Sequence, residues 1–193
     1  MLPIAEMFES IQGEGSMTGT PSFFIRLAGC NMSCSWCDTD HREQYKLHPE
    51  MLLEMLQESR MPHVVITGGE PTIHDELFFV ATEIIKTNKT VQIETNGKLP
   101  YPVFGDPEIL VTVSPKTPEF QRRRGHELKV VWNPAIWTEM SLDHLMPTTD
   151  FKYYYLQPLW KGSDSNIDQV MKQLLGNPRW RLSLQTHKYI GVR

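Results

Sequence analysis

The chain lacks the features of a membrane, secreted or nucleic-acid-binding protein. Its 193 residues contain no apolar run of the roughly 18 residues that a membrane-spanning helix needs. The first 20 residues lack the basic start and apolar stretch of a signal peptide. The formal net charge of -4 gives no basic excess of the kind that binds nucleic acid. We therefore expect a cytoplasmic protein with neither a membrane nor a nucleic-acid partner.

Cysteine is scarce, and all 3 cysteines lie close together, at Cys30, Cys34 and Cys37. An odd number of thiols cannot pair completely, and this C-x₃-C-x₂-C spacing is too crowded for an ordinary disulfide framework. Unpaired cysteines without a secretion signal favour a reducing compartment. The sequence also lacks internal repeats and linker-like stretches, so its length predicts a single domain, residues 1–193.

Thiolates concentrated in one short loop typically bind soft metal, either zinc or an iron–sulfur cluster. A cluster normally takes four cysteines. With three, one iron would stay open to another ligand, as in catalytic metal sites that keep a position for substrate. Two alternatives are a zinc site completed by His41, although such motifs usually come as two separated pairs, and a chance group of inert cysteines.

Strand-like and helix-like patterns alternate along the chain. Strands are expected at 3–12, 22–27, 63–67, 90–94, 109–113, 128–131, 153–156 and 181–185. Helices are expected at 49–60, about 74–87 and 164–175, with a weaker one after Pro134. The alternation predicts an α/β fold with a largely parallel sheet.

The first two helices carry apolar stripes. One stripe contains Met51, Leu52, Met55 and Leu56, and the other contains Leu77, Phe78, Ala81, Ile84 and Ile85. We interpret Met51 and Met55 as core residues and not as metal ligands.

Five loops follow the expected strands, at 30–37, 68–71, 94–97, 114–116 and 157–160. Parallel sheets place ligands at the carboxyl ends of their strands, so we expect these loops to meet around one site. Gly68 and Gly69 would let a ligand approach the backbone closely. Arg26 interrupts an apolar strand and needs a partner, which is either a structural ion pair or a ligand carboxylate.

The cysteine spacing resembles the cluster loop of radical S-adenosylmethionine (SAM) enzymes. The whole chain resembles the 7-carboxy-7-deazaguanine synthase family, through motifs in the same order at 8–15, 24–26, 37–39, 66–71, 93–97, 114–116, 156–158 and 185–189. This resemblance implies a contracted, incomplete (βα) barrel of the radical SAM type and a homodimer.

The resemblance also implies an activity. In radical SAM enzymes an electron from a [4Fe–4S] cluster cleaves SAM to methionine and a 5′-deoxyadenosyl radical, which abstracts hydrogen from the substrate. The family converts 6-carboxy-5,6,7,8-tetrahydropterin to 7-carboxy-7-deazaguanine with loss of ammonia, in queuosine-type deazapurine biosynthesis. The resemblance thus implies a lyase that requires SAM, the cluster, Mg²⁺ and an electron donor such as flavodoxin.

Two other functions are compatible with part of the sequence. A different radical SAM enzyme, such as an activase that installs a glycyl radical, would share the cysteine loop. It would not explain Arg26, the segment 12–15 or the tail. The non-enzyme alternative is a zinc-stabilised binding module.

The resemblance assigns residues to the site. Cys30, Cys34 and Cys37 match the cluster ligands, and Thr39 matches the magnesium ligand. The SAM contacts are matched by Trp36, Cys37, Asp38, Gly69, Ser114, Pro115, Lys116, Gln157, Pro158, Leu159 and Trp160. The substrate pocket is matched by Ile11, Gln12, Gly13, Arg26 and Thr67.

Two segments add further expectations. The resemblance places the tail, 186–193, beside the pterin, and we expect its apolar residues Tyr189, Ile190 and Val192 to dock. The chain is short between Asp40 and Pro49, where many relatives carry a longer excursion. This shortness bears on how the cluster is covered and where a reductase would dock.

Overall fold

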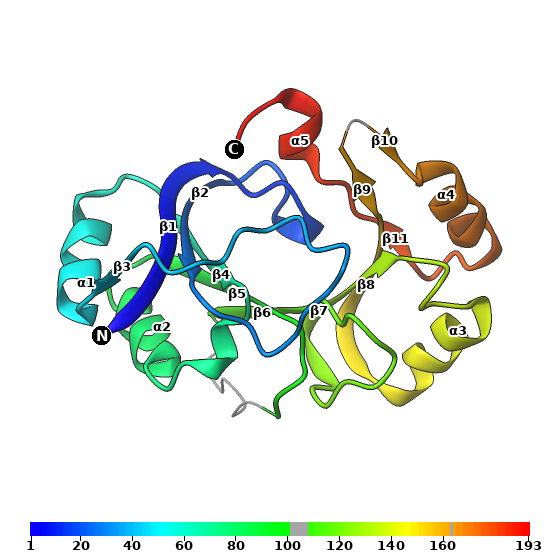
Figure 1. The fold of residues 1–193 in the computed structure, drawn as a ribbon, viewed down its shortest axis with the longest axis horizontal. Helices are drawn as coiled ribbons and strands as arrows, with labels where there is room; N and C mark the ends of the chain where they lie inside the picture. Colours follow the sequence, from blue (N-terminus) through cyan, green and yellow to red (C-terminus); the bar gives the residue numbers. More distant parts are fainter. Residues whose placement is uncertain (101–107, 163) are drawn as a thin grey trace.

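The computed structural model describes residues 1–100, 108–162 and 164–193, whose elements follow one another around a curved sheet (Figure 1). The strands of this sheet are β1 (Leu2–Ile11), β2 (Pro21–Leu27), β3 (Tyr45–Leu47), β4 (His63–Gly68), β5 (Thr90–Thr95), β6 (Ile109–Val113), β7 (Arg124–Trp132), β8 (Asp150–Pro158) and β11 (Arg181–Leu182). The short strands β9 (Trp160–Lys161) and β10 (Asp164–Ser165) pair separately. The helices are α1 (Pro49–Glu58), α2 (Leu77–Ile85), α3 (Glu139–Thr148), α4 (Ile167–Gly176) and α5 (Thr186–Ile190), with 3-10 turns η1 (Gly15–Met17) and η2 (Pro71–Ile73).

The sheet is parallel over most of its width, with strand order β11-β8-β7-β6-β5-β4-β2-β1-β3. The seven strands β2, β4, β5, β6, β7, β8 and β11 are parallel to one another in this order. Strand β1 is antiparallel to both β2 and β3. Within the described ranges the edge strands β3 and β11 do not pair with each other, so the barrel is open. This topology agrees with the predicted incomplete (βα) barrel.

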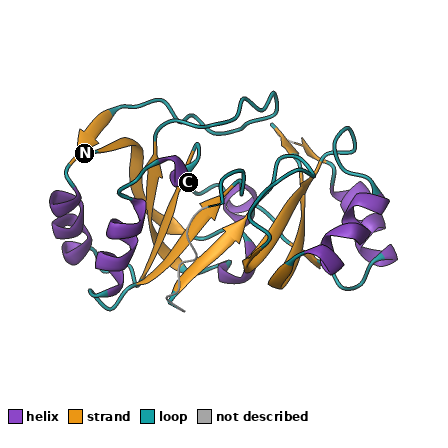
Figure 2. Cartoon of the chain, turned by 90° about the horizontal axis from the view of Figure 1, so that it is seen from below, coloured by secondary structure: helices purple, strands orange, loops and turns teal. Residues whose placement is uncertain are grey.

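The two faces of the sheet differ in chemistry because successive side chains of a strand point to opposite sides. On β5, Val91 and Ile93 are buried in the apolar core, which also contains Leu56 of α1 and Ala81 of α2. The alternate residues of β5, Gln92 and Glu94, belong to the polar inner face. Figures 1 and 2 place α1 and α2 at one flank of the sheet and α3 and α4 at the other. The apolar core therefore lies between sheet and helices, and the barrel interior is polar.

Most strand predictions are confirmed, and the differences have local causes. The strands predicted at 128–131 and 153–156 extend to the whole of β7 and β8, whereas the one predicted at 181–185 is only β11. The helix predicted from 164 begins at Ile167 because 164–165 pair as β10. The weak helix after Pro134 begins at Glu139, where Thr138 and Ser141 form a capping box.

The interpretation of the helix stripes is wrong in part. Leu52 and Leu56 of α1 are buried, but Met51 is 52% exposed and Met55 is 41% exposed. Phe78 of α2, which was predicted to be buried, is 46% exposed, and Val80, which was not in the predicted stripe, is buried. Adjacent helix positions are about 100° apart, so a single layer of sheet covers a narrow stripe and leaves their neighbours outside. Among the described helices, none has the length and apolar character that crossing a membrane requires.

Candidate active site

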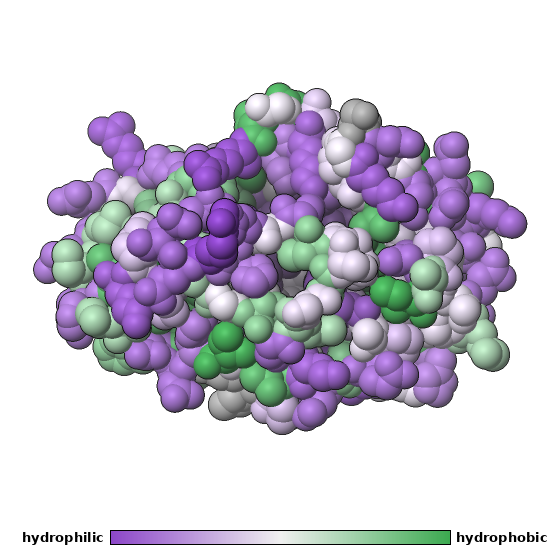
Figure 3. Space-filling model, viewed as in Figure 1, coloured by the Kyte–Doolittle hydropathy of each residue, from purple (hydrophilic) through white to green (hydrophobic). Residues whose placement is uncertain are grey.

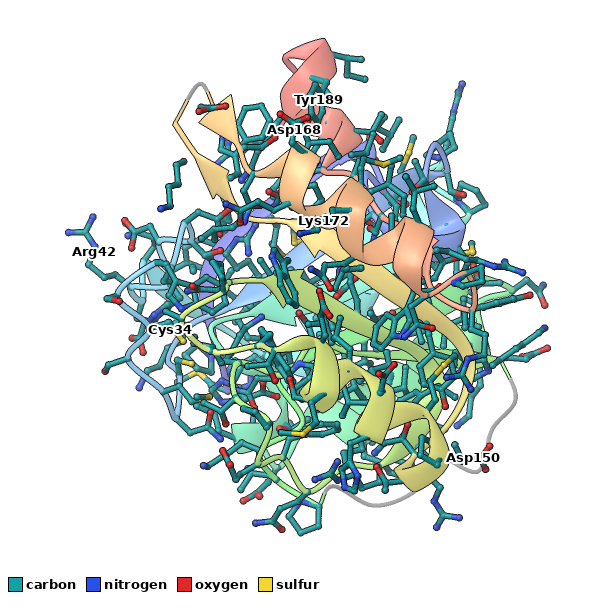
Figure 4. All side chains as sticks on the ribbon, turned by 90° about the vertical axis from the view of Figure 1, so that its right-hand side faces the viewer. Cys34, Arg42, Asp150, Asp168, Lys172 and Tyr189 are labelled. Carbon is teal, nitrogen blue, oxygen red and sulfur yellow. The ribbon has the colours of Figure 1, made fainter. Side chains whose placement is uncertain are left out.

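A cavity of about 420 Å³ lies at the carboxyl ends of the parallel strands, and all five predicted loops contribute to its wall. The loop that carries the cysteines crosses in front of the sheet in Figure 1, and the surface of this face mixes hydrophilic and hydrophobic side chains (Figure 3). In Figure 4, Cys34 lies at the opposite end of the molecule from Asp150, the first residue of β8. The prediction that the loops converge at one sheet edge is confirmed.

Cys30, Cys34 and Cys37 all line this cavity. In the part of the chain that the structure describes, no three His, Cys, Asp or Glu side chains are arranged to hold a metal ion. The Cys37 thiol contacts the Thr39 carbonyl oxygen, with Sγ and O 3.6 Å apart. Three thiols on one loop, facing one cavity, have the donor chemistry of a cluster site, and ligation requires their sulfur atoms to turn toward a common point.

Burial raises the pKa of the Cys30 and Cys34 thiols above the ordinary value. Metal-ligating cysteines must be deprotonated, so binding a metal here would release protons.

A buried carboxylate ties the cysteine loop to two neighbouring loops. Glu70 is fully buried and accepts hydrogen bonds from the Thr95 hydroxyl at 2.6 Å and from the Asn96 backbone N–H at 2.6 Å. The Asn96 side-chain amide donates to Asn31 Oδ1 at 2.8 Å, next to Cys30. The loops after β2, β4 and β5 are therefore held as one unit.

Gly69 has a packing role in addition to the predicted approach of a ligand, which stays a prediction. It lines the cavity, but a Cβ at this position would collide with the Gly29 carbonyl oxygen and with Cys30 Cβ. The missing side chain thus lets the loop after β4 pack directly on the root of the cysteine loop. Gly68 also requires glycine, because its φ of 152° lies in a region that other residues rarely adopt.

A buried charge cluster lies on the inner face of the barrel. The Lys129 ammonium, 3% exposed, donates to Glu94 Oε2 at 2.8 Å and to the Glu14 carboxylate. Although burial opposes its charge, these two carboxylates raise the pKa of Lys129. Burial raises the pKa of Glu94 above its ordinary value. Glu14, Glu94 and Lys129 all line the cavity.

The sequence interpretation missed this charge cluster. Lys129 stands inside a predicted apolar strand, as Arg26 does, so the argument applied to Arg26 would also have identified Lys129 as a residue in need of partners.

Arg26 has the ion pair that was one of its two predicted roles. Its Nε lies 2.7 Å from Glu6 Oε1, and Glu6 also pairs with Arg193. Arg26 lines the cavity as well. The ion pair holds the guanidinium at the cavity wall, and its binding of a ligand carboxylate stays a prediction.

The tail is docked, but by polar groups. The Thr186 backbone N–H donates to the Gly13 carbonyl at 2.9 Å, Lys188 pairs with Asp38, and the Ser10 hydroxyl donates to the Arg193 carbonyl at 2.5 Å. The residues expected to dock are exposed: Tyr189 by 52%, Ile190 by 58% and Val192 by 45%. Tyr189 packs edge-on against the Trp160 ring, with ring centroids 5.1 Å apart, and its hydroxyl lies 3.4 Å from the Ser165 hydroxyl; Figure 4 labels it on the helix at the top of the molecule. The expectation of apolar docking is confirmed for Tyr189, which packs on Trp160, and is wrong for Ile190 at the end of α5 and for Val192 beyond it, which are exposed.

The other predicted site residues divide into two groups. Those that line the cavity are Trp36, Asp38, Thr39, Gly69, Ser114, Lys116, Gln157, Leu159, Trp160, Ile11, Gln12 and Thr67. Gly13, Pro115 and Pro158 are not part of the wall. Gly13 packs against His187 of α5, and Pro158 pairs with Trp132 in the sheet.

Lys116 brings a cation to the cysteine side of the cavity. Its Nζ donates to Ser114 Oγ at 3.0 Å and lies 5.7 Å from the centre of the Trp36 ring. Burial lowers the pKa of Lys116 from its ordinary value. Phe8 and Phe24 also line the cavity, stacked with ring centroids 4.9 Å apart, and the Arg193 guanidinium lies over the Phe8 ring at 4.9 Å.

Comparisons with known proteins agree with one another. Residues 24–116 match the family model described as the radical SAM superfamily. The chain is 38% identical over 196 residues to the 7-carboxy-7-deazaguanine synthase of Bacteroides thetaiotaomicron, covering 100% of both chains. It is 37% identical over 206 residues to the enzyme of that name from Synechocystis, covering 99% of this chain and 93% of the relative. The crystal structure of QueE from Escherichia coli is similar with a TM-score of 0.78 at 33% identity, covering 96% of this chain and 94% of that one.

Proposed function

The chain belongs to the 7-carboxy-7-deazaguanine synthase family of the radical SAM superfamily, and on that premise we propose that it converts 6-carboxy-5,6,7,8-tetrahydropterin to 7-carboxy-7-deazaguanine with loss of ammonia. The observation that carries the proposal is the meeting of five loops at one cavity with the three cysteines on its wall. We further propose a single catalytic domain, a homodimeric assembly, a cytoplasmic location and an electron donor such as flavodoxin.

Radical SAM membership implies a [4Fe–4S] cluster and SAM, which when bound supply the one-electron and hydrogen-abstraction chemistry. Cys30, Cys34 and Cys37 would hold the cluster. The Lys116 ammonium and the Trp36 ring, both on the same side of the cavity, suit the carboxylate and the cationic part of SAM.

The remaining cavity wall matches a carboxylated pterin. The 2-amino-4-oxo edge of a pterin presents adjacent N–H donors, and Glu14 and Glu94 offer carboxylate acceptors on the inner face. The stacked Phe8 and Phe24 provide an apolar wall for the ring system, and Arg26 provides a cation for the carboxylate.

Anaerobic reconstitution with iron and sulfide, followed by incubation with SAM, reductant and the carboxytetrahydropterin, tests the function. We expect 7-carboxy-7-deazaguanine, identified by its mass, to form only when all components are present. A glycyl-radical activase would cleave SAM without making this product. A zinc-binding module would take up stoichiometric zinc and cleave no SAM.

Replacing Arg26 by alanine should weaken binding of the pterin much more than binding of SAM. A hydrogen bond to a charged group is typically worth roughly 1.5–3 kcal/mol, which corresponds to about a 10- to 150-fold loss of affinity. Titration of each ligand into the reconstituted variant measures the two affinities. Arg60→Ala, which removes an exposed arginine before β4, is the matched control. Unchanged pterin affinity in a folded Arg26→Ala protein would leave Arg26 with its ion-pair role alone.

We propose that Mg²⁺ assists substrate binding through Thr39. Mg²⁺ often takes few protein ligands and fills its sphere with water and substrate oxygens. Thr39 and Arg26 both line the cavity, and we place the substrate carboxylate between them. We expect Mg²⁺ to raise turnover of the unmodified protein and to raise it much less in Thr39→Ala, with Thr39→Ser restoring the response. Equal Mg²⁺ dependence in all three proteins would remove Thr39 from the site.

A further inference from the structure

We propose that His63, at the end of the barrel remote from the cavity, is a positioning residue for the cavity carboxylate of Glu94 and acts through the side-chain amide of Gln92. The proposal deepens the proposed function and depends on it in one respect, namely that Glu94 faces the pterin.

His63, Gln92 and Glu94 form a continuous row of polar side chains on the inner face of the barrel. Thr90, Gln92 and Glu94 alternate along β5, so their side chains share one side of the sheet. His63 opens the neighbouring parallel strand β4, directly opposite Thr90. His63 and Gln92 are each 1% exposed, so their polar atoms depend on one another and not on solvent.

The hydrogen bonds around Gln92 fix which way its amide faces. Its Nε2 donates to Glu94 Oε1 at 3.1 Å and to Thr112 Oγ1 at 2.9 Å. The Thr112 hydroxyl in turn donates to Glu127 Oε2 at 3.2 Å, so it needs a donor from Gln92. A reversed amide would place its oxygen against the Glu94 carboxylate and lose both bonds.

Two donors hold the other end of this amide. Gln92 Oε1 accepts from Gln12 Nε2 at 2.9 Å and from His63 Nε2 at 3.2 Å. Because Gln92 Oε1 can only accept, the proton of the neutral His63 ring is on Nε2, and Nδ1 accepts from the Thr90 hydroxyl at 2.7 Å in preference to the Pro62 carbonyl, which lies 3.5 Å from that hydroxyl. Burial lowers the pKa of His63 and keeps the ring in this neutral form.

The orientation of the Gln92 amide affects the cavity because this amide is bonded to the Glu94 carboxylate. Its Oε1 accepts from Gln92 Nε2 at 3.1 Å and from Gln12 Nε2 at 3.5 Å, and its Oε2 accepts from Lys129 at 2.8 Å, so the shorter Gln92 bond and the Lys129 bond fix the plane of the carboxylate. The other charged groups that interact with it are Glu14 and Glu127, together with Lys116 across the cavity. A hydrogen bond to a carboxylate favours its ionised form, so loosening the Gln92 amide should raise the pKa of Glu94 further.

Two variants of His63 distinguish a hydrogen-bonding role of its ring from a role in packing alone. The amide nitrogen of glutamine stands near the place of a histidine Nε2, whereas that of asparagine stands near Nδ1. His63→Gln therefore keeps an N–H donor to the Gln92 side-chain oxygen. His63→Asn keeps an amide near the Thr90 hydroxyl but has no donor that reaches Gln92. We expect the apparent pKa of Glu94 to stay near its unmodified value in His63→Gln and to rise by about half a unit or more in His63→Asn.

Two readouts decide the proposal. Carbon-13 NMR of the glutamate carboxyls in the ligand-free protein, with Glu94 assigned by Glu94→Gln, gives its titration without any cofactor. The pH profile of product formation should show the same shift of its acid limb in His63→Asn, with SAM cleavage unchanged. Identical Glu94 titrations in the two variants would overturn the proposal.

Further controls keep the test decisive. If neither His63 variant folds, Gln92→Met removes the N–H that reaches Glu94 and should raise the Glu94 pKa; an unchanged titration there also overturns the proposal. If the unmodified protein makes no product, the proposed function has failed, and the NMR titration still decides the role of His63.

Discussion

Replacing Cys30, Cys34 or Cys37 by alanine is expected to abolish cleavage of SAM. Four thiolates normally hold a cubane cluster, and this chain offers three, so each variant would leave only two. All three thiols line one cavity and no other cysteine in the sequence could replace a lost one. Iron and sulfide content after anaerobic reconstitution and 5′-deoxyadenosine release in the presence of dithionite measure the effect.

The control for the cysteine variants is Ser35→Ala, which changes an exposed residue of the same loop and keeps every thiol. It should retain iron and cleave SAM at the unmodified rate. Full SAM cleavage in any single cysteine variant would contradict the assignment of that residue. A colourless protein with stoichiometric zinc after reconstitution would contradict all three.

Deleting the tail, 186–193, is expected to remove product formation and to leave the cluster and uncoupled SAM cleavage. The tail lines the cavity with His187, Lys188 and Arg193, so its loss opens the proposed pterin site to water. Its direct tie to the cysteine loop is the Lys188–Asp38 pair, whose carboxylate is 48% exposed. A pair this exposed contributes only up to about 1 kcal/mol, which should leave the loop able to hold the cluster.

Product and 5′-deoxyadenosine are measured together in the truncated protein. Ile190→Ser is the matched control, because it changes an exposed tail residue and keeps the polar contacts. Product at the full-length rate after truncation would make the tail dispensable. Loss of iron would instead assign the tail to holding the cysteine loop.

The sequence alone was sufficient to predict most of the strands and the position of the site at their carboxyl ends. Short apolar runs such as 63–67 and 90–94 end at polar or glycine-rich loops, and parallel strands bring those ends together. The sequence was insufficient to predict the partners of side chains that contact distant segments of the chain. Lys129 and Glu14 are 115 residues apart, and no local pattern specifies their pairing.

The errors on α1 and on the tail have a related cause. Met51 and Ile190 are apolar, and a local sequence pattern treats apolar residues as candidates for burial. Whether such a residue is covered depends on how wide the facing surface is, which only the assembled fold decides. For the tail, the fold supplies polar partners on β1 and on the cysteine loop and leaves Ile190 and Val192 exposed.

The close packing of Gly69 on Gly29 fixes the point at which the cysteine loop leaves the sheet. Main-chain hydrogen bonds from Glu70 to Gly29 at 3.0 Å and from Gly29 to His41 at 3.0 Å close the root of the cysteine loop. Residues added after His41 and before β3 would therefore lengthen the connection without moving Cys30. Doubling the length of a flexible loop costs only about 0.6 kcal/mol in closure entropy. We therefore expect the segment between Asp40 and Pro49 to accept added residues with Cys30 held in place.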